Sequence, residues 1–139
     1  MRVVLDANIW VSAAIRAGPA HRIVQAWLAG SASFDVVICP ALIAEVEEVL
    51  TQRPRMRKWI ALDVAEHFVE TIRVLADLVP DPAAAEPTTR DVDDDYLVAL
   101  AREYEADHIV TGDKDLLEWP EQRPPVLTPA AFAELVGEE

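Results

Sequence analysis

The stretch Arg2-Val3-Val4-Leu5-Asp6-Ala7-Asn8 decides the fold of this 139-residue chain. A short run of β-branched and apolar residues without polar alternation is typical of a strand buried on both faces of a parallel sheet. The run ends at an acid, Asp6, and Asn8 then begins a predicted helix that reaches Ala14 before Gly18-Pro19 breaks it. A strand that leads directly into a helix predicts the first half of a β-α-β unit.

The same alternation continues along the chain and predicts an α/β fold. Further strands are predicted at residues 35–39, 73–79, 108–110 and 126–127, and further helices at 20–28, 41–51, 64–71, 93–104 and 128–136. Residues 53–58 read as a loop or a short irregular helix, and residues 81–89, rich in Pro and Ala, as a surface connection. We therefore expect a three-layer α/β/α sandwich around a parallel sheet of about five strands, forming a single domain over residues 1–139.

The composition narrows the class of protein. A hydrophobic content of 52% suits one globular core, and no apolar run is long enough to span a membrane. The N-terminus enters the first strand directly, without the features of a signal peptide, and the single cysteine, Cys39, suits a reducing compartment. We expect a cytoplasmic protein. One cysteine and three scattered histidines also argue against a zinc site built from sulfur and imidazole.

The net charge of −13 is concentrated in one part of the chain. Residues 81–139 contain 16 of the 25 acids and 4 of the 12 bases. Such a surface repels nucleic acid unless cations gather there first. The charge therefore indicates either a solvated acidic surface or a cluster of carboxylates that binds metal.

The positions of the carboxylates favour the metal. Asp6 and Asp113 each follow a predicted strand, and in a parallel sheet both would reach the same edge. On the helix at 93–104, Asp94 shares the inward face with Leu97, whereas Asp95 is turned about 100° away, toward the rim.

The helix at 41–51 offers two candidates, Glu45 and Glu47, which flank its apolar face on opposite sides, and helical geometry does not choose between them. Carboxylates from four places in one cleft would form a hard-oxygen site suited to Mg²⁺ or Mn²⁺. Metal-dependent nucleases use this arrangement.

Four ordered motifs carry a family resemblance. They are residues 3–8 (VVLDAN), 42–46 (LIAEV), 91–97 (DVDDDYL) and 109–116 (IVTGDKDL). In order, spacing and placement they resemble the PIN-domain family of ribonucleases, and most closely its toxin components of toxin–antitoxin pairs, related to VapC-type toxins. The resemblance covers essentially the whole chain. It implies the strand order 3-2-1-4-5 and a Mg²⁺- or Mn²⁺-dependent endoribonuclease that cuts RNA.

The resemblance also implies roles for individual residues. It assigns catalysis and metal binding to Asp6, Glu45 and Asp113. The family's spacing to Thr111 would select Asp95 as the remaining acid, but we prefer Asp94 because it lies on the apolar side of its helix, and we keep Asp95 and Asp115 as accessory ligands. Asn8 and Thr111 match positions that support the site through hydrogen bonds.

The acidity of the chain departs from what an RNA-binding protein needs. The best phosphate contacts are Arg53, Arg55, Arg57 and Lys58, with Arg16 and Arg22 as possible neighbours. A second subunit could supply further bases, so we expect a homodimer, formed through an apolar face that includes some of Trp10, Trp27 and Trp59. A basic antitoxin segment would be a suitable partner for the acidic surface.

Three other functions compete with the nuclease. A phosphoacceptor receiver domain needs an acid after its third strand, where this chain has Val79-Pro80, and a Lys after its fifth. A haloacid-dehalogenase-type phosphatase needs an acid two residues after Asp6, where this chain has Asn8. A catalytically silent PIN-like module that binds RNA or protein remains the alternative.

Overall fold

The computed structural model describes residues 1–83 and 92–138, and it is built around a five-stranded sheet in which every pair of neighbours is parallel. The strands are β1 (Arg2–Leu5), β2 (Asp35–Ile38), β3 (Asp77–Leu78), β4 (His108–Val110) and β5 (Val126–Leu127). Their order is β3-β2-β1-β4-β5, which confirms the expected α/β fold and strand order. Because β1 is central, all three of Val3, Val4 and Leu5 are fully buried.

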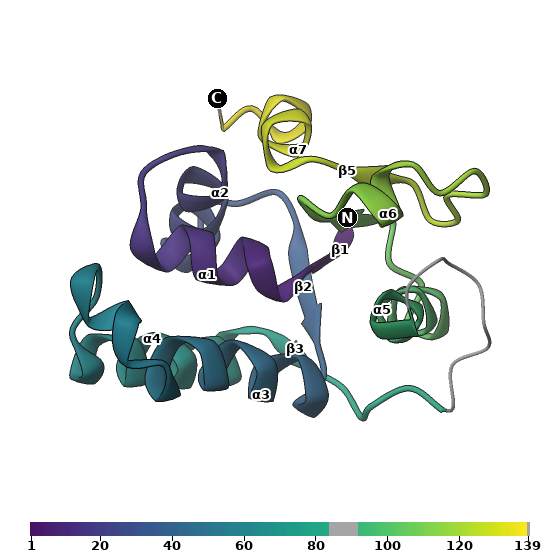
Figure 1. Ribbon diagram of the computed structural model, residues 1–139. Coiled ribbons are helices and arrows are strands. Elements are labelled where there is room, and N and C mark those ends of the chain that lie inside the picture. Colours follow the sequence, from purple (N-terminus) through teal and green to yellow (C-terminus); the bar gives the residue numbers. More distant parts are fainter. Residues whose placement is uncertain (84–91, 139) are drawn as a thin grey trace.

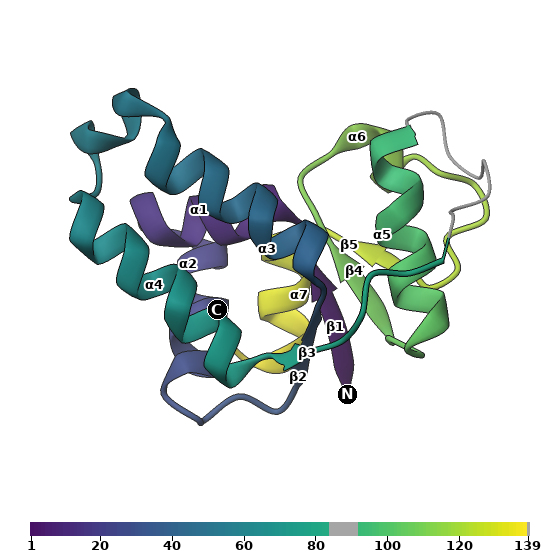
Figure 2. The same ribbon diagram turned by 90° about the horizontal axis from the view of Figure 1, so that it is seen from below.

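Helices cover both faces of this sheet. They are α1 (Ala7–Ile15), α2 (Pro19–Leu28), α3 (Pro40–Glu47), α4 (Leu62–Leu75), α5 (Val92–Glu103), α6 (Lys114–Leu117) and α7 (Pro129–Val136). Figure 1 shows α1 and α2 on one side of β2, with α3 and α4 antiparallel below them. In Figure 2 the strands separate α1–α4 from α5 and α6, as right-handed crossovers require, and α7 packs against α2.

The thicker helical layer is held together by aromatic packing. Trp10 on α1 is fully buried and meets Trp27 of α2 edge to face, with 5.4 Å between the ring centroids. Phe68 of α4 approaches the same indole at 6.4 Å. Edge-to-face pairs of this kind add to the free energy gained by burying the rings themselves. They fix α1, the helix that carries Asp6 at its start.

The third strand is shorter than we predicted from residues 73–79. Helix α4 continues to Leu75, and β3 contains Asp77 and Leu78 alone. Two features of α4 explain the difference. Ile72 extends its buried face, and the guanidinium of Arg73 pairs with Glu70 at 3.3 Å and with Glu47 of α3 at 3.1 Å. A β-branched composition indicated a strand, but contacts with a neighbouring helix prevailed.

The helix predicted at 41–51 is divided. Helix α3 ends at Glu47, and residues 48–52 form a π-helical turn in which the Thr51 hydroxyl donates to the Glu47 carbonyl at 2.7 Å. Pro54 then opens a 3₁₀ helix, Pro54–Lys58, where we predicted a loop or a short irregular helix. Of the connection predicted at 81–89, the structure describes residues 81–83, and the rest lies outside the described residues.

None of the helices in residues 1–83 and 92–138 combines the length and the apolar character needed to cross a bilayer.

Candidate metal and nucleic-acid site

Asp6 lies at the carboxyl end of the central strand and caps α1. Its Oδ1 accepts a hydrogen bond from the backbone N–H of Ala7 at 2.7 Å. Its Oδ2 accepts from the hydroxyl of Thr111 at 2.7 Å and from the amide of Asn8 at 3.1 Å. The side chains of Asn8 and Thr111, the two residues to which the resemblance assigned a supporting role, therefore hold the carboxylate of Asp6 in place.

The protein environment disfavours the ionised form of the Asp6 carboxyl. The residue is 7% exposed, and its burial raises the pKa of the carboxyl above its ordinary value, with the negative charge of Asp113 acting in the same direction. The hydrogen bonds from Thr111, Ala7 and Asn8 oppose that rise. A cation nearby would stabilise the ionised form further.

Thr111 joins the ends of β1 and β4. Its fully buried hydroxyl donates to Asp6 and accepts from the backbone N–H of Asp113 at 3.0 Å. Asp113 in turn caps α6, since its Oδ1 accepts from the backbone N–H of Asp115 at 2.9 Å. One hydroxyl thus fixes two acids that come from different strands.

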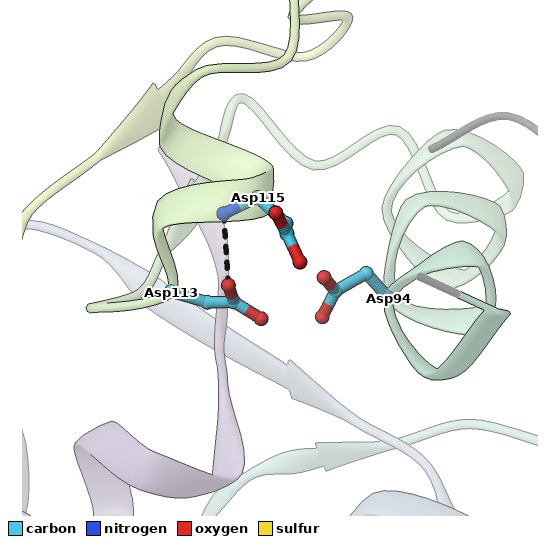
Figure 3. A group of neighbouring side chains, drawn as sticks. All are labelled: Asp94, Asp113 and Asp115. Carbon is cyan, nitrogen blue, oxygen red and sulfur yellow. Dashed lines mark hydrogen bonds between the residues drawn. The ribbon is translucent and has the colours of Figure 1, made fainter. Parts of the chain in front are cut away.

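A third acid reaches the same place from α5. Figure 3 shows the carboxylates of Asp94, Asp113 and Asp115 pointing toward one another, the first from the start of α5 and the others from the start of α6. One oxygen from each lies within 4.8 Å of the others. Three carboxylates at this separation repel one another, and as hard oxygen donors they fit Mg²⁺ or Mn²⁺.

Asp94 and Asp113 also border a cleft of about 630 Å³. Asp6, Glu45, Asp94 and Asp113 all line it, so the structure brings together the four acids that the sequence pointed to. Glu45 is exposed on α3, whereas Glu47 turns to the other flank of that helix and pairs with Arg73 at 3.1 Å. Of the two glutamates that helical geometry could not separate, Glu45 faces the cleft and Glu47 does not.

Asp95 is placed differently from our expectation. We expected its side chain at the rim, but it is 4% exposed, as buried as Asp94 at 5%. It lies outside the set of residues that line the cleft. The helical wheel failed here because it used the apolar residues alone to define the inward face, and α5 is buried over a wider arc than those residues span.

The basic residues divide into two groups. Arg53 and Arg55 line the cleft together with Arg16, which stands just after α1. Arg57 is used elsewhere, donating to the carbonyl of Leu50, and Lys58 is exposed outside the cleft. Arg22, which the sequence suggested as a neighbour of this group, donates to the carbonyl of Glu138 instead, at 3.2 Å.

The π-helical turn and Pro54 account for the position of the cleft arginines. A continued α-helix would have kept its 3.6-residue period, whereas the wide turn at residues 48–52 and the proline redirect the chain before Arg55. Arg53 also pairs with Glu48 at 3.2 Å, an exposed ion pair that a stronger anion could replace.

Sequence reasoning missed part of the cleft wall. Ser12, Tyr96, Val11, Ile15, Val49 and Met56 line it as well. Ser12 could have been found, because it stands one helical turn after Asn8 on the same face of α1. The tryptophans, in contrast, make no cleft contact, and Trp10 is too deeply buried to belong to an association face as we expected.

The comparisons with known proteins agree with this geometry. The model of the PIN domain family matches residues 2–115, and the chain belongs to that family. No match was found among curated proteins.

Two solved structures share the fold, each at 13% sequence identity. The crystal structure of VapBC2 from Rickettsia felis, bound to a DNA fragment from their promoter, aligns with a TM-score of 0.61 over 91% of this chain and 97% of that one. The structure of Mycobacterium tuberculosis VapC20, a toxin that cleaves the sarcin-ricin loop, aligns with a TM-score of 0.55 over 81% of this chain and 91% of that one.

Proposed function

We propose that the protein is an endoribonuclease that depends on Mg²⁺ or Mn²⁺ and hydrolyses phosphodiester bonds of RNA. The observation that carries the proposal is the cleft itself, whose wall combines carboxylates from the ends of β1 and β4, from α3 and from α5 with three arginines. Membership of the PIN domain family supports it.

The residues of the cleft divide the work between them. Asp6, Glu45, Asp94 and Asp113 hold the cation, with Asp115 beside them and Asp95 as a further accessory candidate. The bound cation supplies positive charge that stabilises the phosphoryl transition state and helps to activate water. Asn8 and Thr111 keep Asp6 oriented, and Arg53 and Arg55 hold the phosphate backbone beside the acids.

We further propose that the protein is the toxin of a toxin–antitoxin pair and acts as a homodimer in the cytoplasm. The two structural neighbours support the toxin role, since one is a VapBC assembly and the other a toxin that cleaves the sarcin-ricin loop. A cognate antitoxin with a basic segment would complement the net charge of −13.

The decisive experiment is cleavage of a mixed-sequence RNA by the purified protein. We expect cleavage with Mg²⁺ or Mn²⁺ and none in excess chelator, with recovery when Mn²⁺ is restored. The matched variants are Asp113→Asn, which removes one charge from the cleft, and Asp107→Asn, which changes an exposed acid at the far end of β4. Full activity in chelator, or an active Asp113→Asn, would contradict the proposal.

The alternative is a silent PIN-like module that binds RNA or a protein without cutting. The pI of about 4.5 and the Glu48 partner of Arg53 favour weak engagement of RNA. In that case calorimetry would show that the protein binds Mn²⁺, and the cleavage assay would show no cut RNA.

A further inference from the structure

A second hollow adjoins the acidic cleft. It has a volume of about 470 Å³ and is lined by Asn8, Ile9, Ser12, Gly112, Asp113 and Pro129. Three of these residues, Asn8, Ser12 and Asp113, also line the cleft. The two hollows therefore adjoin, and these shared residues separate them. We call the second one the side groove.

Helix α1 carries two of the shared residues. Asn8 and Ser12 stand one turn apart, so they form a ridge along the exposed side of the helix. Val11 and Ile15 lie on the cleft side of the ridge, whereas Ile9 lies on the side-groove side. A chain bound across the acids can pass over this ridge beside Asp113 and continue into the side groove.

The two hollows differ in charge. The cleft has Arg16, Arg53 and Arg55 in its wall. Of the six residues that line the side groove, Asp113 is the charged one, and it is an acid. A phosphate placed there would meet repulsion without a compensating base, so the side groove suits an uncharged part of the ligand.

The remaining groups match a nucleobase. Pro129, which is half-buried above the buried Ile9, supplies apolar surface for the flat face of a base. Ser12 supplies a hydroxyl for its polar edge, and the exposed Asn8, whose amide also donates to Asp6, borders the same edge. Asn8 is held in place, because its Oδ1 accepts from the backbone N–H of Gly112 at 3.4 Å. At Gly112 the chain leaves open space, since an added Cβ would meet nothing nearer than that oxygen at 4.0 Å.

We propose that the side groove is a nucleobase subsite that holds one unpaired base of the RNA strand on the side of the acids away from the arginines. It makes the enzyme selective for the base next to the cut and requires a single-stranded substrate. This inference rests on the proposed function, because the same strand must run through the acidic cleft.

The test is to fill the side groove from Gly112. Gly112→Leu projects a large side chain into it, and Gly112→Ala adds a methyl group that the space accommodates. The matched control is Ala131→Leu, which adds the same bulk to an exposed position of α7 outside the groove. Circular dichroism establishes that each variant is folded. If the leucine variant is not, Gly112→Ala replaces it, because its methyl group takes up part of the groove and should weaken binding in the same direction by a smaller factor.

Binding is measured separately from cleavage. The probes are fluorescent hexanucleotides of RNA that differ in one base, with Ca²⁺ in place of Mn²⁺ and the RNA recovered intact, and the readout is anisotropy at several salt concentrations. We expect Gly112→Leu to weaken binding about fivefold or more and to remove the preference among bases, as the loss of one stacked base would. The salt dependence should stay unchanged, because no phosphate contact is lost.

Each outcome decides. Wild-type affinity and base preference in both Gly112 variants would overturn the subsite, as would a change confined to the salt dependence, or no detectable binding of RNA by the wild type. Binding that follows the expected pattern without Mn²⁺-dependent cleavage would keep the subsite and overturn the proposed nuclease.

Discussion

Thr111 is the residue on which two acids of the cleft depend. Its hydroxyl donates to Asp6 and accepts from the backbone N–H of Asp113, and the residue is fully buried. A hydrogen bond to a charged group contributes more than one to a neutral group. Thr111 therefore stabilises the charged form of Asp6 in particular.

We expect Thr111→Val to destabilise the protein in a pH-dependent way. The native pKa of Asp6 is raised, so its ionisation costs stability as the pH rises through that pKa, and the Thr111 hydrogen bond offsets part of the cost. Removing it should lower the free energy of unfolding by about 1–3 kcal/mol at neutral pH. The loss should shrink once the pH falls below the pKa of Asp6.

Urea unfolding of both proteins at several pH values measures this difference. Thr71→Val is a suitable control, because the hydroxyl of Thr71 donates to the His67 carbonyl of its own helix and not to a carboxylate. A loss for Thr111→Val that is equal at acidic and neutral pH would show that the hydroxyl does not act on the charge of Asp6.

The aspartates at 94 and 95 should respond differently to the same substitution. Asp94 lines the cleft and approaches Asp113 and Asp115, so Asp94→Asn should lower cleavage by about a hundredfold or more at saturating Mn²⁺. Without metal, the loss of like-charge repulsion should raise its melting temperature. Asp95 is buried away from the cleft wall, so Asp95→Asn should reduce stability more than cleavage per folded molecule.

Assays of both variants on one RNA, with melting curves in chelator, separate the two roles. An inactive Asp95→Asn beside an active Asp94→Asn would mean that the spacing to Thr111 identified the metal ligand better than the helix face did.

At the scale of elements, the π-helical turn and the 3₁₀ helix after it form an arm that carries Arg53 and Arg55 to the cleft. We expect Arg53→Gln and Arg55→Gln each to weaken RNA binding, and to reduce the slope of log affinity against log salt by about one phosphate contact. Lys58→Gln, on the same arm but outside the cleft, should change neither quantity. Fluorescence anisotropy over a salt series provides the measurement, and equal slopes in all four proteins would exclude the arm from phosphate binding.

Elements whose sequence and environment agree could be predicted from the sequence. The runs at residues 2–5, 35–38 and 108–110 are buried on both faces, so their composition alone indicates strands. The sequence pattern failed where contacts with another element determine the structure. The ion pair of Arg73 with Glu47 depends on the packing of α3 against α4, and a helical wheel does not represent the wider period of the π-helical turn.

The site followed the same rule. Asp6 and Asp113 could be located because strand ends in a parallel sheet share an edge. Glu45 could not be separated from Glu47 until the position of α4 was known, and the burial of Asp95 depends on what covers the second flank of α5. The side groove could not be predicted, because it forms where α1 meets the start of α7 and no sequence motif links these two elements.

At the scale of the whole molecule, we expect a homodimer in solution. Trp59 is 53% exposed, and Leu62 and Val64, which follow it in the first turn of α4, are exposed as well, so the start of α4 offers apolar surface. Trp59→Ser should shift the monomer–dimer equilibrium toward monomer in sedimentation velocity. Leu135→Ser is the matched control, since Leu135 is equally exposed at 53% on α7. Monomeric wild type at high micromolar concentration would contradict the dimer.

The strand order has a consequence for the stage of synthesis at which the cleft can form. Thr111 and Asp6 bond across 105 positions of sequence, and β1 lies between β2 and β4. At about 5–20 residues per second, a ribosome that has released Asp6 needs several more seconds to synthesise Thr111. The unfinished chain therefore lacks Thr111 and Asp113 during most of its synthesis, and an antitoxin of the kind we propose has that interval in which to be ready.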